Sequence, residues 1–216
     1  MAPNTTLHII RHAEGLHQLP RDHPNISIRD PSLTPNGIEQ SKRFRDHYPY
    51  HASTDLLCAS PLRRTIQTAS IAFEPEVQRG LKILAVADAQ ETTDAPSDTG
   101  SDLNKLVAEF GTVLDLSLLG EGWNEKSGIN GTSEMAIWKR AWRLRRFIRN
   151  RSENDIVLVT HGAFAHYITE HVDPQGHQTG EYWQNVMWRT YTFESVDDED
   201  AMLLETEESR QRGGKH

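Results

Sequence analysis

The sequence predicts an α/β protein, a three-layer α/β/α sandwich with a mostly parallel central sheet. Short apolar runs alternate along the chain with segments that carry apolar residues at helical spacing. Strands that alternate with helices build parallel sheets with helices on both faces. The length of 216 residues suits one domain, so we expect residues 1–216 to fold as a single unit.

The strands are predicted from apolar runs. The run over 156–160 is the clearest, because five apolar or β-branched residues follow one another there. An acidic turn at 197–200 separates the last two segments, which we therefore expect to be antiparallel. In chain order, the predicted strands cover 7–10, 55–59, 81–87, 156–160, 188–193 and 201–205.

The helices are predicted from their caps and from apolar spacing. Thr34 and Pro35 have the residue types of an N-cap and a first helical position, and Ser60 and Pro61 repeat the pattern. In chain order, the predicted helices cover 35–45, 61–73, 103–110, 134–150 and 162–170.

Two segments differ from this regular alternation. Residues 92–131 are rich in Asp, Thr, Ser and Gly, and we interpret them as a cap inserted after the third strand, over one end of the sheet. The polar residues 207–216 are expected to form a loose tail.

Two predicted strands end in histidine. The first strand leads into His12, and the strand over 156–160 leads into His161. In parallel strands that lie close together, both side chains would reach the carboxyl edge of the sheet, where such proteins bind ligands. Either histidine alone is compatible with an ordinary strand end. The repetition, with Gly162 permitting close backbone approach, favours a two-histidine site.

These residue types suit phosphoryl transfer. A neutral histidine nitrogen can attack phosphorus, and fixed cations must then match the phosphoryl charge. Arg11 adjoins His12, and a predicted helix start offers Arg63 or Arg64, between which helical geometry does not decide. The loop after the third strand offers Glu91 and Asp94 as equal candidates for the proton donor to the leaving oxygen.

Four sequence blocks resemble the histidine phosphatase superfamily, the phosphoglycerate-mutase-like proteins. They occur in the family's order between residue 7 and about residue 170. The blocks are Arg-His-Ala-Glu-Gly at 11–15, Asp-Pro-Ser-Leu-Thr-Pro-Asn-Gly-Ile-Glu-Gln at 30–40, Ser-Pro-Leu-Arg-Arg-Thr-Ile-Gln-Thr-Ala at 60–69 and Val-Thr-His-Gly at 159–162.

The resemblance implies a role for each matching position. His12 matches the family's nucleophile, and His161 matches the second pocket histidine, which holds the transferring phosphoryl group. Arg11 and Arg64 match the phosphate-binding arginines, and Glu91 matches the general acid. The implied fold is the same sandwich, and the implied chemistry uses no metal and no cofactor.

Two positions depart from the family pattern. Gln18 stands where many relatives have an Asn that touches phosphate, so we count Gln18 and Gly162 as candidate substrate-binding residues. The Arg-x-Tyr-Gly-x-Leu stretch of the mutases has no counterpart within 92–100, which favours hydrolysis. We therefore expect a phosphatase that acts on a small phosphorylated metabolite through a phosphohistidine. The alternatives are mutase-type phosphotransfer and a non-catalytic phosphate-binding module.

Two other kinds of hydrolase are weighed against this interpretation. Cys58 and Arg64 have the Cys-x5-Arg spacing of cysteine-dependent phosphatases, but Pro61 removes a backbone N–H that such a loop needs. The eleven histidines suggest a metal hydrolase, but no His-Glu-x-x-His or Cys-x2-Cys pattern is present. The loop residues His17 and His23 are expected to be surface or helix-packing residues.

Composition limits the partners. The net charge of −8 argues against nucleic acid, which is bound mainly by clustered Lys and Arg. No signal peptide or membrane-spanning apolar run is evident, and Cys58 is the only cysteine, so we expect a cytoplasmic protein. The sequence determines neither the natural substrate nor the oligomeric state.

Overall fold

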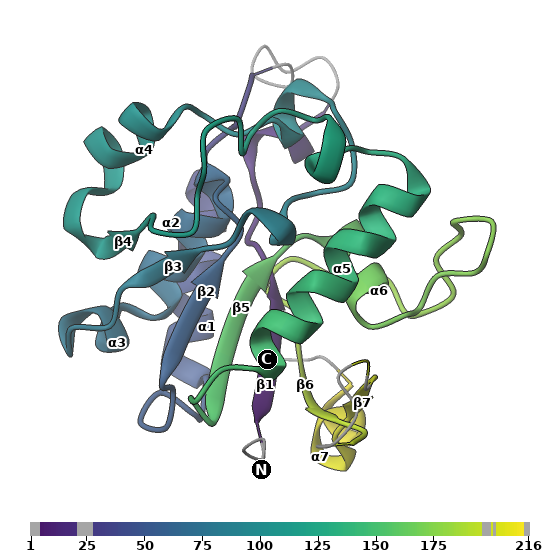
Figure 1. The fold of residues 1–216 in the computed structure, drawn as a ribbon. Coiled ribbons are helices and arrows are strands. Elements are labelled where there is room, and N and C mark those ends of the chain that lie inside the picture. The colour runs from purple at the N-terminus through teal and green to yellow at the C-terminus, as the bar shows by residue number, and fades with distance from the viewer. Residues whose placement is uncertain (1–4, 21–27, 196–199, 201, 214–216) are drawn as a thin grey trace.

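The computed structural model describes residues 5–20, 28–195, 200 and 202–213. It confirms the predicted sandwich, with a seven-stranded, mostly parallel sheet between helices (Figure 1). The strands are β1 (Thr6–Arg11), β2 (Leu56–Ala59), β3 (Ile83–Ala85), β4 (Leu114–Asp115), β5 (Asp155–Thr160), β6 (Trp188–Phe193) and β7 (Leu203–Glu205). Their order across the sheet is β4-β3-β2-β5-β1-β6-β7.

The strand order brings distant parts of the sequence to one edge. β5 lies between β1 and β2 and runs parallel to both. Arg11 is paired with Thr160, and Ala59 is paired with Val159. The residues that follow these strands therefore emerge side by side at the carboxyl edge of the sheet. β6 and β7 are antiparallel, as the sequence predicts.

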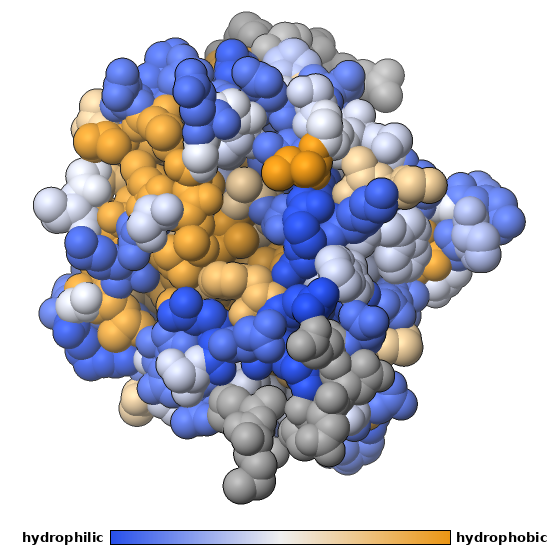
Figure 2. All heavy atoms as spheres, in the orientation of Figure 1, coloured by the Kyte–Doolittle hydropathy of each residue, from blue (hydrophilic) through white to orange (hydrophobic). Residues whose placement is uncertain are grey.

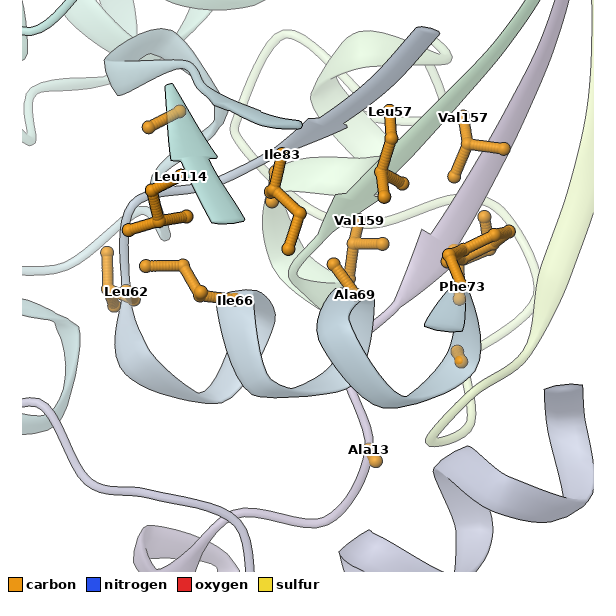
Figure 3. Packing of buried hydrophobic residues seen from close by; sticks show 14 of the residues in the cluster. Ala13, Leu57, Leu62, Ile66, Ala69, Phe73, Ile83, Leu114, Val157 and Val159 are labelled. Atoms are coloured by element: carbon orange, nitrogen blue, oxygen red, sulfur yellow. The ribbon is translucent and has the colours of Figure 1, made fainter. Parts of the chain in front are cut away.

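Helices cover both faces of the sheet. They are α1 (Pro35–His47), α2 (Arg63–Ala72), α3 (Glu74–Gln78), α4 (Leu103–Phe110), α5 (Glu134–Arg149), α6 (Gly162–Ile168) and α7 (Glu207–Arg212). In Figure 1, α1 and α2 lie behind the sheet and α5 lies in front of it. Figure 3 shows the apolar side of α2, with Ile66 and Ala69, facing Ile83 and Val159 of the sheet.

A second core lies between the sheet and α5. Because side chains alternate along a strand, Ile156 and Leu158 of β5 pack on this side, whereas Val157 and Val159 join the cluster under α2. Strands buried on both faces read as continuous apolar runs, which is why β5 was the clearest strand in the sequence.

The start of α2 differs from the prediction. The helix begins at Arg63 and not at Pro61, and Leu62 is its N-cap residue. The Leu62 side chain has no acceptor, and the carboxylate of Asp30, distant in sequence, accepts from the first helical N–H instead. Asp30 Oδ1 accepts from the Arg63 backbone N–H at 2.8 Å, and Oδ2 accepts from the N–H of Ser101 at 2.7 Å. Asp30 thus ties the first turn of α2 to the segment 92–131. The hydroxyl of Ser60 is engaged elsewhere, with His161.

The segment 92–131 is more varied than a simple cap. It contains the predicted helix at Leu103–Phe110, but Leu114–Asp115 form β4, which pairs with β3 and extends the sheet. The two-residue strand carries no periodicity, and the sequence therefore did not reveal it. The short turn Pro96–Asp98 of the same segment lies at the carboxyl edge of the sheet, where Asp98 forms an ion pair with Arg64.

The prediction of a loose tail is wrong over Glu207–Arg212, which form α7. The hydroxyl of Thr206 caps this helix, and the Arg212 guanidinium lies 3.5 Å from the ring centroid of Trp188. These contacts hold a segment whose polar composition alone suggests none. Residues 214–216, and Ala201 at the start of the predicted last strand, lie outside the described residues.

The face shown in Figure 2 includes an apolar hollow on the side of the molecule that carries β3 and β4 in Figure 1. Its lining includes Leu118, Ile129 and Phe147, and a neighbouring hollow includes Leu56 and Leu84. Leu118 and Ile129 are exposed.

Over the described ranges, no helix combines the length and the apolar character needed to span a bilayer.

We expect Asp30→Ala to destabilise the fold by about 1–3 kcal/mol, because two buried backbone N–H groups would lose their acceptor. Asp46→Ala is the matched control, since Asp46 is exposed and pairs only with its neighbour Arg45 and is therefore expected to change stability little. Urea unfolding of both variants measures the difference. Equal stabilities would contradict the role assigned to Asp30.

Candidate active site

The carboxyl edge of the sheet brings the two predicted histidines together. His12 follows β1 and His161 follows β5, and their ring centroids are 5.1 Å apart. Both side chains are buried. The parallel pairing of β1 with β5 produces this juxtaposition, because it places the two strand ends at the same level.

A buried arginine joins the two rings. Arg64 Nε donates to His12 Nε2 at 3.2 Å, and Arg64 Nη2 donates to His161 Nδ1 at 3.0 Å. Arg63 turns away and binds Glu109, with Nε donating to Oε2 at 2.7 Å. The geometry therefore selects Arg64 over Arg63, in agreement with the position that the family resemblance indicates.

The hydrogen bonds of His12 define its tautomer. Nδ1 lies 2.7 Å from the carbonyl oxygen of Ala13, which can only accept, so Nδ1 carries the proton. Nε2 then presents a lone pair toward Arg64. Burial, followed by the charges of Arg64 and Arg11, lowers the pKa of His12 well below 6.5. His12 is consequently a neutral imidazole with its Nε2 lone pair in the site.

His161 is held in the complementary arrangement. Its Nδ1 accepts from Arg64, so its neutral ring carries the proton on Nε2, which lies 2.8 Å from the hydroxyl oxygen of Ser60. Burial and the charge of Arg64 lower the pKa of His161 well below its ordinary value. Ser60 belongs to a recognised block, but its contact with His161 is evident only in the structure.

Arg11 lies at the same edge and touches Gly162. Its Nη1 donates to the hydroxyl of Tyr182 at 3.0 Å and also to the carbonyl of Trp183. A Cβ atom on Gly162 would lie 3.1 Å from Arg11 Nε, tighter than an ordinary contact. Glycine therefore gives the Arg11 guanidinium the room to lie against the first turn of α6.

Glu91 places a carboxyl group in this site. Its Oε1 accepts from the N–H of Thr92 at 2.9 Å and of Phe164 at 3.2 Å. Burial and the neighbouring charge of Asp98 raise the pKa of Glu91, while Arg64 opposes the change. Both backbone contacts fall on Oε1, so Oε2 is the oxygen available to carry a proton.

Two cations fix the backbone at Glu91, and the sequence analysis missed both. Arg140 of α5 donates to the carbonyl oxygens of Gln90 at 2.8 Å and Glu91 at 3.1 Å. Lys126 Nζ donates to the Glu91 carbonyl at 3.3 Å, and burial lowers the pKa of Lys126 to about 8. Arg140 could have been noticed, because it interrupts the apolar face of α5 between Ile137 and Leu144.

Asp98 is a second carboxylate that the sequence did not single out. Its Oδ1 accepts from Arg64 Nη2 at 3.0 Å, and its Oδ2 accepts from the Thr93 hydroxyl at 2.6 Å. Asp94, the other sequence candidate, is exposed. The polar segment around 94–98 has no pattern that distinguishes one Asp from another, so only the fold selects Asp98.

Gln18 lies near the site, but its amide is engaged in holding the loop. Its Oε1 accepts from the Gly15 N–H at 3.0 Å and from Asn185 Nδ2 at 3.1 Å, and its Nε2 donates to Asn185 Oδ1 at 3.2 Å. Asn185 Nδ2 also donates to the carbonyl of His12 at 3.0 Å. In this structure Gln18 therefore orders the backbone after His12.

His17 was expected to be a surface or helix-packing residue, but the structure places it beside the site. The side chain is half-buried, and its ring centroid lies 5.6 Å from that of His12. Burial and the charges of Arg64 and Arg11 lower the pKa of His17 to about 3. No periodicity marks a single loop histidine, so its position could not be read from the sequence. His23 lies outside the described residues.

The second recognised block positions the loop that follows His12. Thr34 Oγ1 donates to Glu14 Oε1 at 2.6 Å, and the N–H of Glu14 donates to Gln40 Oε1 at 2.8 Å. A Cβ on Gly37 would lie 2.1 Å from the Glu14 carbonyl oxygen, so α1 needs glycine at that point. This block thus acts through backbone placement.

Cys58 lies in the core between the sheet and α5, and it takes no part in the site. It is fully buried, and burial raises the pKa of its thiol to about 12. A thiolate nucleophile at this position is contradicted by both observations. Within the described part of the chain, no group of three or more His, Cys, Asp or Glu residues is arranged to hold a metal ion.

Comparison with known proteins identifies the family of the chain. The model of the histidine phosphatase superfamily (branch 1) matches residues 7–196. The chain therefore belongs to the histidine phosphatase superfamily. None of the curated proteins matches the sequence.

Solved structures share the fold at low sequence identity. A putative alpha-ribazole-5'-P phosphatase from Escherichia coli has a TM-score of 0.61 and 19% identity, over 93% of this chain and 96% of that one. A mycobacterial glucosyl-3-phosphoglycerate phosphatase has a TM-score of 0.60 and 17% identity, over 94% and 97%. A phosphoserine phosphatase mutant from Entamoeba histolytica, in complex with phosphoserine, has a TM-score of 0.55 and 20% identity, over 92% and 94%.

We expect Cys58 to be inert toward Ellman's reagent in the folded protein and to react fully once the chain is unfolded in guanidinium. A buried thiol with a raised pKa supplies no thiolate to the reagent. Absorbance of the released thionitrobenzoate measures both states. Rapid reaction of the folded protein would reopen the cysteine-dependent interpretation.

Proposed function

We propose that the protein is a metal-independent phosphatase that hydrolyses a small phosphorylated metabolite through a phosphohistidine on His12. The observation that carries the proposal is the His12–Arg64–His161 cluster. In this cluster the neutral imidazole of His12 has the lone pair of its Nε2 beside the buried guanidinium of Arg64, and the imidazole of His161 lies on the other side of that guanidinium. A nucleophile and a charge-matching cation within contact distance are what phosphoryl transfer requires.

In the first step, the Nε2 lone pair of His12 forms a bond to phosphorus while the bond from phosphorus to the leaving oxygen breaks. The electron pair of that bond stays on the leaving oxygen, which takes the proton of Glu91. The products are an alcohol, a phosphohistidine and a Glu91 carboxylate. Arg11, Arg64 and His161 surround the phosphoryl oxygens, and bidentate arginine contacts suit their charge.

In the second step, water attacks phosphorus and Glu91 takes a proton from it. The bond between phosphorus and Nε2 breaks, the electron pair returns to His12, and inorganic phosphate leaves. Glu91 thus acts first as an acid and then as a base. The raised pKa of Glu91 supports the first role, and the lowered pKa of His12 supports its role as a neutral nucleophile.

A small metabolite is proposed as the substrate class. The structurally similar phosphatases are named for alpha-ribazole-5'-P, phosphoserine and glucosyl-3-phosphoglycerate. The site of this chain is deeply set, because His12, Arg64 and His161 are at most 2% exposed. Such burial suits a phosphate on a small leaving group. The particular substrate is a matter for screening.

We expect the wild-type protein to release phosphate from p-nitrophenyl phosphate in excess EDTA, and His12→Ala to lose at least roughly a thousandfold of that activity. The loss follows from removal of the attacking nitrogen. Thermal unfolding should be nearly unchanged, since His12 lies at a strand end. Activity that depends on an added metal, or that survives in the variant, would refute the proposal. No activity in either protein would favour the binding-module alternative.

We expect Glu91→Gln to reduce kcat for an alkyl phosphate by roughly a hundredfold or more, and for p-nitrophenyl phosphate much less, because nitrophenolate leaves without a proton. Equal losses on both substrates would argue against Glu91 as the donor.

The wild-type activity should also depend on pH. The reactive forms are neutral His12, which persists below pH 6.5, and protonated Glu91, which persists above its ordinary pKa of 4.5. Wild-type activity on the alkyl phosphate should therefore fall as pH rises and Glu91 loses its proton.

A further inference from the structure

The side-chain amide of Gln18 is engaged within the turn that follows His12. Gln18 was a candidate substrate-binding residue, but both polar atoms of its amide are bound to Gly15 or Asn185. The same hydrogen bonds order the turn Leu16–Gln18 against the backbone of His12. His17 lies in the middle of this turn, so the ordered backbone directs its side chain toward the site.

His17 has the surroundings of a ligand-binding residue. Its ring lies 5.6 Å from His12, between centroids, and it stands in the field of Arg11 and Arg64. Its Nδ1 is shielded from solvent and has no hydrogen-bond partner within the described residues. A buried polar atom without a partner is costly, and a bound ligand often supplies the missing contact.

Gly15 makes room for this ring. A Cβ atom at position 15 would lie 2.8 Å from both Nδ1 and Cε1 of His17, and 3.4 Å from Cδ of Arg64. Any larger residue at position 15 would push the imidazole from its place beside Arg64. The local sequence Gly15-Leu16-His17 therefore packs the ring against the anion-binding arginine.

We propose that His17 is a further phosphoryl-binding residue, whose ring N–H donates a hydrogen bond to an oxygen of the phosphoryl group held by Arg11 and Arg64. The inference rests on the proposed function, because it concerns the same anion. A neutral imidazole has one N–H to donate, and burial together with the charges of Arg64 and Arg11 lowers the pKa of His17 and so keeps the ring neutral.

The test is calorimetric titration of the folded protein with inorganic phosphate, without turnover. We expect His17→Phe, which keeps a flat ring but has no donor, to weaken phosphate binding about tenfold or more. His17→Gln restores a donor and should recover most of the affinity. His177→Phe is the control, because His177 is exposed and its side chain pairs with Asp173, away from the His12–Arg64–His161 cluster, so it should leave binding unchanged.

The outcomes separate this inference from the proposed function. Wild-type-like phosphate binding by a folded His17→Phe variant, together with hydrolysis by the wild type, would overturn the role of His17 alone. Absence of both phosphate binding and hydrolysis in the wild type would overturn the two together. If His17→Phe does not fold, ¹⁵N NMR of the wild-type His17 ring decides. A phosphate-induced shift supports the contact, and an unchanged resonance refutes it.

Discussion

The site depends on one buried guanidinium, that of Arg64. It contacts His12, His161 and Asp98, which come from a strand end, another strand end and the inserted segment. Its position follows from the start of α2, which Asp30 fixes by capping Arg63. Burial lowers the pKa of Arg64, and the nearby carboxylates counter that effect. A buried cation needs such partners, so the surrounding groups are arranged around it.

The same guanidinium shows how an acidic chain can hold a local concentration of positive charge. The net charge of −8 lies on the molecule as a whole, whereas Arg11 and Arg64 concentrate positive charge at one edge of the sheet. Burial lowers the pKa of both His12 and His161, and the charge of Arg64 adds to that effect at each ring, so both imidazoles are neutral. The carboxylates of Asp98 and Glu91 share the space, and Asp98 forms an ion pair with Arg64. The carboxylate charge therefore partly offsets the charge of the buried guanidinium.

The recognised blocks divide into chemistry and scaffolding. The blocks at 11–15, 60–69 and 159–162 carry the groups that meet at the site. The block at 30–40 acts at a distance, because Thr34, Gly37 and Gln40 hold Glu14 and so the loop after His12. A sequence pattern shared by a family can therefore mark residues that position the backbone as well as residues that lie in the site.

The sequence by itself determined the sandwich fold, the family and five residues that meet at the edge, because apolar periodicity and residue order are local properties. It did not find Arg140, Lys126, Asp98 or His17, nor β4 and α7. These residues and elements act through contacts between segments distant in the chain, and a polar loop offers no period to mark them. Only the tertiary structure selects them, because the strand order and the burial of each charge decide which polar groups must find partners.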